Sequence, residues 1–501
     1  MKKLAPLLRW ALRLAGGAAL VLATLVLVRA FDARRMGPLK PWHTVVPASE
    51  LRAGELDEGF SMSHYLSREE VVFREVRTRV EAAVAPADRE VANRYWHGSP
   101  LSPSRFPKDG NRTFELVPDV VRGGVLLLHG LTDAPYSMRR LAETYRDLGY
   151  YALALRLPGH GTVPAALTEA TWRDWAAAVR VGARHVRSRA GAGTPFHVVG
   201  YSNGGALAVD YALDVAGGAR LPRPDRLVLV SPMIGVAPAA GFARALGVLG
   251  VFPFFRASRW LDVTPEYIPF KYGSFPVNAA VQTAALTKEI RRKVTRAAES
   301  RTLGTLPPVL AFVSLVDATV RTDATVHDLF DRLAPNGSAL VVFDVNRNAV
   351  VRTFLKRRDE SLLADLLPPR ARSYRLTVVT NGADPTAEVV ERDVPPGRPE
   401  ATDRPLGLSW PRQVYSLSHV ALPFPPDDSL FGGEPGADEG AGVHLGTLQP
   451  RGEKSVLSVP VDQLMRLTWN PFFPYLEERV RAWAALPRDT AGGPGSRPRA
   501  E

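Results

Sequence analysis

The stretch "FHVVGYSNGGALAVDYALDVA", residues 196–216, decides the fold, because three local signals follow one another in it. An apolar burst typical of a buried strand leads into a serine between two glycines. Apolar residues at helical spacing follow the second glycine. The stretch therefore predicts a strand, then a sharp turn that carries Ser202, and then a helix.

The turn has the pattern G-x-S-x-G, with Gly200 and Gly204 on either side of Ser202. Between a strand and a helix, this pattern presents the serine hydroxyl as a nucleophile at the edge of a sheet. The sharp turn strains the serine backbone, and small neighbours avoid clashes there. The helix start behind it supplies backbone N–H groups and a positive dipole end. The alternative interpretation is a serine that only caps the helix, with glycines for close packing.

Composition narrows the chemistry further. The chain has 501 residues, 46% of them hydrophobic, which is enough for a large core. It has no cysteine, which excludes disulfides, thiolate nucleophiles and cysteine zinc sites and leaves serine as the leading nucleophile. The net charge of +12 comes from scattered arginines, and we find no nucleic-acid motif. We therefore interpret the charge as a solvated surface close to anionic lipid headgroups and expect no nucleic-acid partner.

Outward from the turn, short apolar runs alternate with helical patterns from about residue 113 onward. This alternation predicts a mostly parallel sheet with helices on both faces, the α/β class. The predicted strands are 123–130, 151–159, 196–202, 226–232, 306–317 and 338–344, and the predicted helices are 136–150, 171–190 and 203–216.

Two stretches interrupt the alternation. Residues 233–303 are rich in aromatics and helix formers, and we interpret them as a helical cap at the edge where open α/β sheets bind ligands. The aromatics that suggest an apolar acyl pocket, or else simply the core of the cap, are Phe242, Phe252, Phe254, Phe255 and Trp260. A second insertion at about 345–410 is expected to fold out from the sheet as an excursion that brings the chain back to it.

The predicted domain spans 111–488, after an N-terminal extension at 36–110 and before a disordered tail at 489–501.

Three segments carry a resemblance to a known family: "LLLHGLTDAPYSMRRLAETYRDLGYYALALRLPGHGT", "VVGYSNGGALA" and "VLAFVSLVDATV". On these segments the chain resembles the α/β-hydrolase superfamily, and within it the capped monoacylglycerol lipase, lysophospholipase and serine-aminopeptidase-like group. The resemblance implies the α/β-hydrolase fold and an oxyanion hole formed by the backbone N–H groups of Leu131 and Asn203. No cofactor or metal is implied. His129 is interpreted as a structural histidine that orients the loop before Leu131.

The catalytic acid is expected after the turn, at the end of a later strand. Asp317 closes the strand "PVLAFVSLVD" and resembles the acid of the family. Its alternative role is a helix cap, with Thr319 and Val320 starting the helix. Asp344, at the end of "ALVVFD", is the second candidate.

The chain order Ser, Asp, His leaves three of the ten histidines as the general base: His327, His419 and His444. His327 lies on a predicted helix face, and His444 lies in a glycine-rich stretch. His419 follows "RQVYSL", a predicted last strand, so a loop at the sheet edge presents it between Ser202 and Asp317. We therefore predict His419 as the base; the alternative is an ordinary loop histidine.

The first 35 residues predict an N-terminal transmembrane helix. Basic residues precede the apolar run 14–28 more heavily than they follow it, which predicts a cytoplasmic N-terminus and a body beyond the inner membrane. The run becomes long enough to span if residues 10–31 are counted and the flanking arginines snorkel. A cleaved signal peptide is the alternative, although no clean cleavage site follows.

Together these features predict a membrane-anchored serine hydrolase that cleaves small-molecule or lipid-derived carboxylic esters through an acyl-enzyme. Two other functions remain open. A peptidase on the same fold would need an acidic group for the substrate's amino terminus, and Glu266 is the candidate in the cap. The second is a membrane-tethered binding protein that keeps the hydrolase fold but has lost its catalytic activity.

Overall fold

A computed structural model describes residues 36–235, 253–349, 358–382, 388–435, 444–447 and 461–486, with a few scattered positions between 10 and 24. The predicted anchor, apart from those positions, and the predicted tail lie outside the described residues. Within the described part, no helix has the length and apolarity to cross a membrane.

The core of the described structure is a ten-stranded sheet in the order β1-β3-β2-β4-β5-β8-β9-β10-β11-β12. Neighbours from β3 to β10 run parallel, whereas β1, β11 and β12 pair antiparallel. The strands are β1 (Phe114–Leu116), β2 (Gly123–Leu128), β3 (Tyr150–Leu155), β4 (Phe196–Tyr201), β5 (Arg226–Val230), β8 (Val309–Ser314), β9 (Ala339–Phe343), β10 (Arg375–Asn381), β11 (Glu388–Val394) and β12 (Thr402–Ser409). The predicted, mostly parallel sheet is therefore confirmed.

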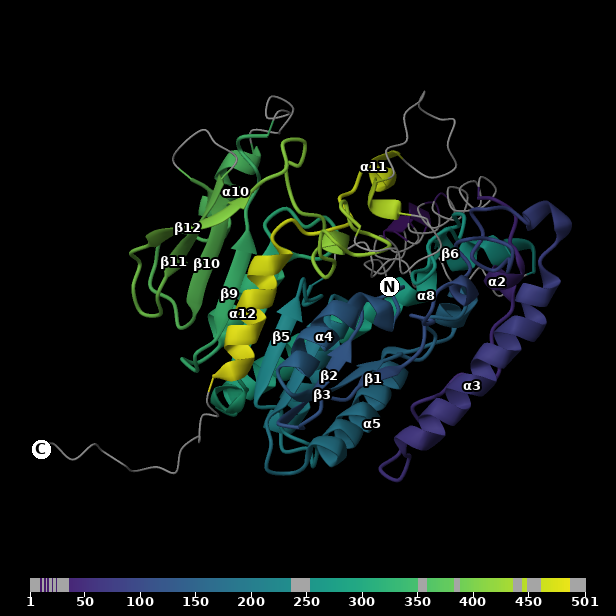
Figure 1. The fold of residues 1–501 in the computed structure, drawn as a ribbon, viewed down its shortest axis with the longest axis horizontal. Coiled ribbons are helices and arrows are strands. Elements are labelled where there is room, and N and C mark those ends of the chain that lie inside the picture. Colours follow the sequence, from purple (N-terminus) through teal and green to yellow (C-terminus); the bar gives the residue numbers. More distant parts are fainter. Residues whose placement is uncertain are drawn as a thin grey trace, which may run out of the picture.

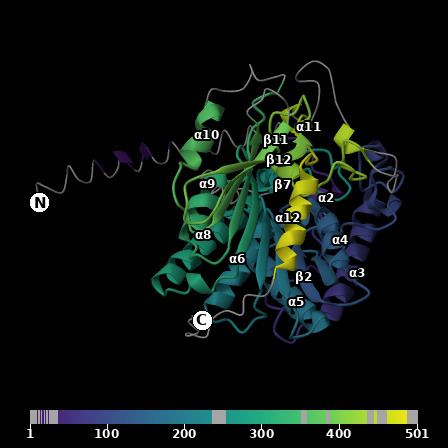
Figure 2. The ribbon, with the colours of Figure 1, turned by 60° about the vertical axis from the view of Figure 1, so that its left-hand side comes forward.

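Helices cover both faces of this sheet, as its apolar strands require. In Figure 2, α6 and α8 lie on one side of the sheet and α4 and α12 on the other. The described α-helices are α2 (Pro41–Thr44), α3 (Met62–Arg79), α4 (Arg139–Asp147), α5 (Trp172–Ala190), α6 (Asn203–Ala216), α8 (Val277–Glu299), α9 (Thr322–Ala324), α10 (Arg358–Leu366), α11 (Val461–Leu464) and α12 (Phe473–Ala485). Two large apolar clusters join helices to the strands, one through α5, α6 and α8 and the other, on the opposite face, through α4 and α12.

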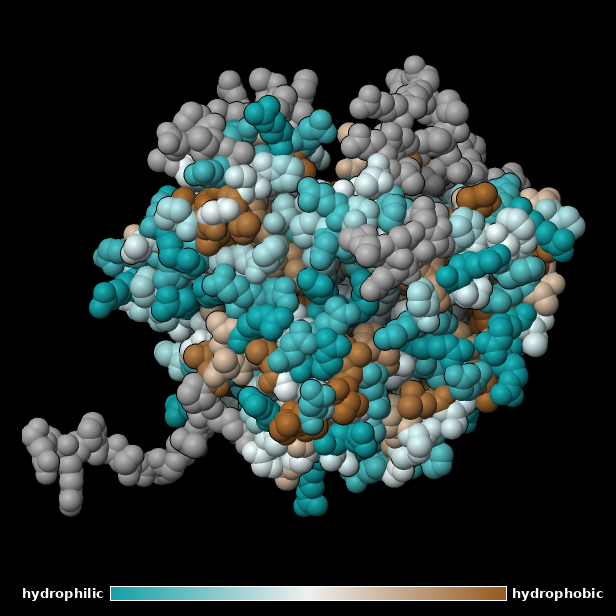
Figure 3. Space-filling model, viewed as in Figure 1, coloured by the Kyte–Doolittle hydropathy of each residue, from teal (hydrophilic) through white to brown (hydrophobic). Residues whose placement is uncertain are grey.

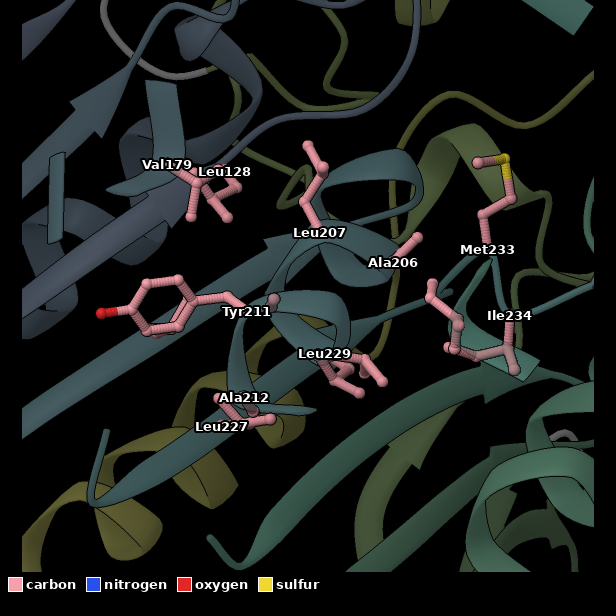
Figure 4. Close-up of a cluster of buried hydrophobic side chains, with 14 of the residues drawn as sticks. Leu128, Val179, Ala206, Leu207, Tyr211, Ala212, Leu227, Leu229, Met233 and Ile234 are labelled. Carbon is pink, nitrogen blue, oxygen red and sulfur yellow. The ribbon is translucent and has the colours of Figure 1, made fainter. Parts of the chain in front are cut away.

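The helix after the turn packs tightly against the sheet. Leu207 and Ala212 of α6 belong to one buried cluster with Leu128 of β2 and Leu229 of β5, which Figure 4 shows in close-up. The apolar face of α6 therefore fixes the start of the helix relative to the ends of these strands.

The insertion at 345–410 differs from its prediction. It adds β10, β11 and β12 to one end of the central sheet instead of folding out from it (Figure 1). The predicted strand "RQVYSL", 412–417, is wrong: these residues form a loop, in which the carbonyl of Tyr415 accepts a hydrogen bond from Asn346. The β11–β12 hairpin already occupies this end of the sheet. The chain therefore continues from β12 to His419 as a loop, without another strand.

The predicted cap boundary also needs correction. Helix α8 lies within 233–303, but it packs on α6, and its apolar residues belong to the core cluster of that face. Lys293 of α8 binds Asp210 and Asp214 of α6 at 2.7 and 2.6 Å. Residues 277–299 are therefore part of the layer that covers the sheet, not of a cap.

The N-terminal extension packs directly on the hydrolase body. Arg156, which follows β3, is fully buried and forms ion pairs with Glu50 at 3.0 Å and Glu69 at 3.1 Å. Tyr65 of α3 donates a hydrogen bond to the carbonyl of Arg156. Since an unpaired charge at such a depth is strongly destabilising, the body depends on the two carboxylates from the extension.

One face of the molecule is mostly hydrophilic. Hydrophilic residues spread over most of the face in Figure 3, and apolar side chains gather there in separate patches.

Candidate active site

Ser202 lies at the corner between β4 and α6 in a strained conformation, with φ 54° and ψ −114°. Its N–H donates to the carbonyl of Val230 at 2.9 Å, and its own carbonyl accepts from Met233 at 3.0 Å. Such a conformation costs about 1–3 kcal/mol and persists only where the surroundings enforce it. The Ser202 side chain makes no capping hydrogen bond to α6, so the helix-cap interpretation of this serine is wrong.

The two glycines are required by close backbone approach. A Cβ on Gly200 would lie 2.3 Å from the carbonyl oxygen of Gly204. A Cβ on Gly204 would lie 2.1 Å from the carbonyl oxygen of Leu128. Both distances are far below van der Waals contact, so the turn can form only with glycine at these positions.

Asp317 and His419 lie together although 102 residues separate them: Nδ1 of His419 is 2.7 Å from Oδ2 of Asp317. Their side chains are 1% and 4% exposed, respectively. Burial disfavours the charged carboxylate, but the facing His419 and hydrogen bonds hold the pKa of Asp317 below its usual range. The histidine ring is therefore held by a charged acceptor on one nitrogen, which leaves the other nitrogen for a second partner.

Asp317 also accepts hydrogen bonds from the N–H groups of Thr319 and Val320, at 2.7 and 2.9 Å. These bonds go to Oδ1, whereas His419 contacts Oδ2. Helix α9 starts only at Thr322, so Asp317 closes a turn rather than capping the helix. The turn orients the carboxylate toward His419.

His419 lies beside the strand that leads to the serine. Its ring is 5.4 Å from the ring of Tyr201, centroid to centroid, and the Tyr201 hydroxyl donates to its carbonyl at 3.5 Å. Between described residues, no hydrogen bond joins the Ser202 hydroxyl to His419. The structure thus pairs Asp317 with His419 and shows no contact between His419 and the Ser202 hydroxyl. Such contacts are often long in ligand-free enzymes.

The second candidate acid, Asp344, has other partners. It accepts a hydrogen bond from the Thr380 hydroxyl at 2.8 Å and forms an ion pair with Arg347. It therefore holds β9 to its neighbours instead of orienting a histidine.

The other two candidate histidines also have local partners. His327 is half-exposed and binds Asp331 at 2.9 Å. Nδ1 of His444 lies 2.9 Å from the carbonyl oxygen of Ser429. Of the three histidines after Asp317, His419 alone contacts that carboxylate among the described residues.

The predicted oxyanion donors follow two strand ends: Leu131 lies in the loop after β2, and Asn203 is the first residue of α6, after β4. Within the described part of the chain, neither the Leu131 nor the Asn203 N–H donates a hydrogen bond, so both remain available. His129 is fully buried, with Nδ1 2.8 Å from the carbonyl of Gly130 and Nε2 accepting from Leu157 at 3.1 Å. Burial lowers the pKa of His129 to about 3. It is therefore a neutral, structural histidine, as predicted.

Glu266 does not offer a free carboxylate for a substrate. It is 1% exposed, and its two oxygens accept hydrogen bonds from the N–H groups of Gly273 and Ser274 at 2.9 and 2.8 Å. Burial raises its pKa. The sequence interpretation of Glu266 as an anchor for a peptide amino terminus is therefore wrong; it holds a loop.

One contact of the site had no signal in the sequence. The loop that carries Leu131 bonds to residues 138 positions later, since Lys271 contacts Asp133 at 2.8 Å. Neither residue lies in a recognisable motif, and no local pattern predicts a pairing over such a distance.

Comparison with known proteins agrees with this architecture. Residues 125–347 match the model of the alpha/beta hydrolase family. The thermostable monoacylglycerol lipase of Bacillus sp. (strain H-257) is 31% identical over 198 residues, which make up 39% of this chain and 71% of the relative. The solved monoglyceride lipase of Saccharomyces cerevisiae, a soluble variant, is 16% identical with a TM-score of 0.36, over 46% of this chain and 81% of that one. The solved monoacylglycerol lipase of Paleococcus ferrophilus is 16% identical with a TM-score of 0.35, over 46% of this chain and 87% of that one.

The Bacillus relative decides the assignment, because its 31% identity extends over 71% of its own length. The chain belongs to the alpha/beta hydrolase family, among its ester-hydrolysing enzymes.

Proposed function

We propose that the chain is a serine esterase in which Ser202 is the nucleophile, His419 the general base and Asp317 the acid that orients the histidine. The observation that carries this proposal is the 2.7 Å contact between His419 and Asp317, which leaves Nε2 of the histidine as the proton acceptor. The strained backbone of Ser202 at the end of β4 supports it, because such strain is characteristic of active sites.

The reaction then runs in two halves. Ser202 Oγ attacks the ester carbonyl while His419 takes its proton, and the N–H groups of Leu131 and Asn203 donate to the oxyanion. His419 returns the proton to the leaving alcohol, which gives an acyl-enzyme. Water, deprotonated by the same histidine, then releases the acid and restores Ser202.

The proposed substrate is a monoester of a fatty acid with a small alcohol. Support comes from the Bacillus relative, a monoacylglycerol lipase. Of the aromatics expected to line an acyl pocket, Trp260 is 1% exposed, so it is core rather than pocket wall. The other four side chains lie outside the described residues. The acyl length is therefore a question for the assay below.

A fluorophosphonate probe and a panel of esters with graded acyl length, each with its amide counterpart, test this proposal. We expect labelling at Ser202 in peptide mass spectra and faster turnover of esters than of the matched amides. The control is Ser231→Ala, which removes another buried serine with positive φ at the end of the neighbouring strand and should keep the labelling. A folded protein without labelling would instead indicate a binding protein, and faster amide turnover a peptidase.

We also propose that residues 1–35 anchor the chain in the inner membrane, with residues 36–501 beyond it. The support is the heavier positive charge before the apolar run, at Lys2, Lys3, Arg9 and Arg13. A reporter fused after Glu501 should behave as exported. Cytoplasmic activity of the reporter would contradict this orientation, and a shortened soluble product would indicate a cleaved signal peptide.

A further inference from the structure

The loop that carries the oxyanion donor is joined to a distant segment, residues 264–274. The N–H of Tyr272 donates to the carbonyl of Thr132 at 2.9 Å. Asp133 and Lys271 form an isolated antiparallel bridge, and their side chains form an ion pair at 2.8 Å. Backbone and side-chain bonds thus hold both residues that follow Leu131.

This segment is itself fixed from the N-terminal extension. The guanidinium of Arg94, which is 2% exposed, donates to the carbonyls of Ile268 and Lys271 at 3.3 and 3.2 Å. The Arg94 N–H donates to the carbonyl of Glu266 at 2.9 Å. The backbone that carries Lys271 is therefore held in place by hydrogen bonds, which fixes the position of Lys271 relative to Asp133.

The position of Asp133 makes its charge important for the reaction. A Cβ on Gly130 would lie 2.9 Å from Asp133 Oδ2, so the carboxylate lies against the residue before Leu131. The Asp133 side chain is only 6% exposed, so water screens its charge poorly. After burial, the Asp133 carboxylate is the strongest influence that raises the pKa of Tyr201, the neighbour of Ser202. A bare negative charge here would oppose the oxyanion that forms at the Leu131 N–H.

We infer that Lys271 is a positioning residue for ester hydrolysis: it neutralises Asp133 and holds it beside Gly130, so that the Leu131 N–H can stabilise the oxyanion. The inference rests on the proposed serine esterase function. It assigns the segment 264–274 a role in turnover rather than in substrate binding. Removing the lysine charge should therefore lower kcat and leave KM nearly unchanged.

The test compares Lys271→Met, Asp133→Asn and the double variant in ester hydrolysis, with thermal melting to show that each is folded. We expect Lys271→Met to lower kcat about 10-fold, equivalent to about 1.4 kcal/mol, with KM within about twofold of wild type. In the double variant no carboxylate remains to be neutralised. Its kcat should return to within about threefold of the wild-type value, which allows for the usual error of double-mutant cycles.

Lys40→Met is the matched control, because Lys40 forms a comparable ion pair with Asp88 at 2.5 Å in the N-terminal extension. Its kcat should equal that of wild type. A wild-type kcat in Lys271→Met, or a folded double variant as slow as Lys271→Met, would overturn the inference. Both outcomes differ from failure of the proposed function, in which the wild-type protein itself would not hydrolyse esters and Ser202 would not be labelled.

Discussion

Replacement of His419 by alanine is expected to lower kcat for ester hydrolysis by about 10⁴–10⁶-fold, as loss of the base does in serine hydrolases. Nδ1 of His419 is already occupied by Asp317 at 2.7 Å, so the ring is oriented to take a proton on Nε2. Without the imidazole, Ser202 keeps its proton and attacks only slowly. Stopped-flow release of a chromogenic alcohol measures acylation directly, and the melting temperature shows whether the variant is folded.

His444→Ala is the matched control for this prediction. His444 also follows Asp317 in the chain, but its Nδ1 lies 2.9 Å from the carbonyl oxygen of Ser429. We expect the variant to keep at least about half of the wild-type kcat, because His444 is only partly buried and does not contact Asp317. If His444→Ala lost acylation and His419→Ala kept it, the base would be His444.

Much of the fold could be predicted because its signals are local. In the central sheet, β2, β3, β4, β5, β8 and β9 are short apolar runs, and α5 and α6 show helical spacing between clear ends. The turn around Ser202 needs only five residues, and the steric reason for Gly200 lies within that turn, whereas that for Gly204 is the carbonyl of Leu128 in β2. The same locality made Asp317 recognisable at the end of β8.

The insertion could not be predicted in the same way. Strands β10, β11 and β12 exist through pairing with β9 and with one another, and β12 is mostly exposed. Pro405 and Gly407 in β12 and the charged residues of β11 are not typical of a buried strand. The return of the chain to His419 through a loop, rather than a strand, follows from where these strands end.

The ion pair between Asp133 and Lys271 shows a second limit. It joins two unrelated stretches 138 residues apart, and its meaning depends on how close the carboxylate lies to Gly130. Glu266 shows the converse: its chemistry suggested a substrate anchor, but burial and two backbone donors give it a structural role. Residue type predicts a role only when the partners of the side chain are known.

Gly204→Ala is expected to destabilise the fold by about 3 kcal/mol or more, at the upper end of overpacking substitutions. The added Cβ would lie 2.1 Å from the carbonyl oxygen of Leu128. Backbone atoms on both sides form this contact, so no side-chain rotation can relieve it, and α6 must move away from β2. Urea or thermal unfolding measures the loss, and the displaced turn should also abolish labelling of Ser202.

Gly217→Ala, at the opposite end of the same helix, separates this steric effect from a general effect of losing a glycine. Gly217 has φ −79°, which alanine adopts freely, and its added Cβ would lie 3.3 Å from the carbonyl oxygen of Leu213. The variant should be within about 1 kcal/mol of wild type, because alanine also reduces the freedom of the unfolded chain. If Gly204→Ala melted at the wild-type temperature, α6 and β2 would have to lie farther apart than their packing indicates. The strain at Ser202 would then lack its support, since the helix start that enforces it would be free to shift.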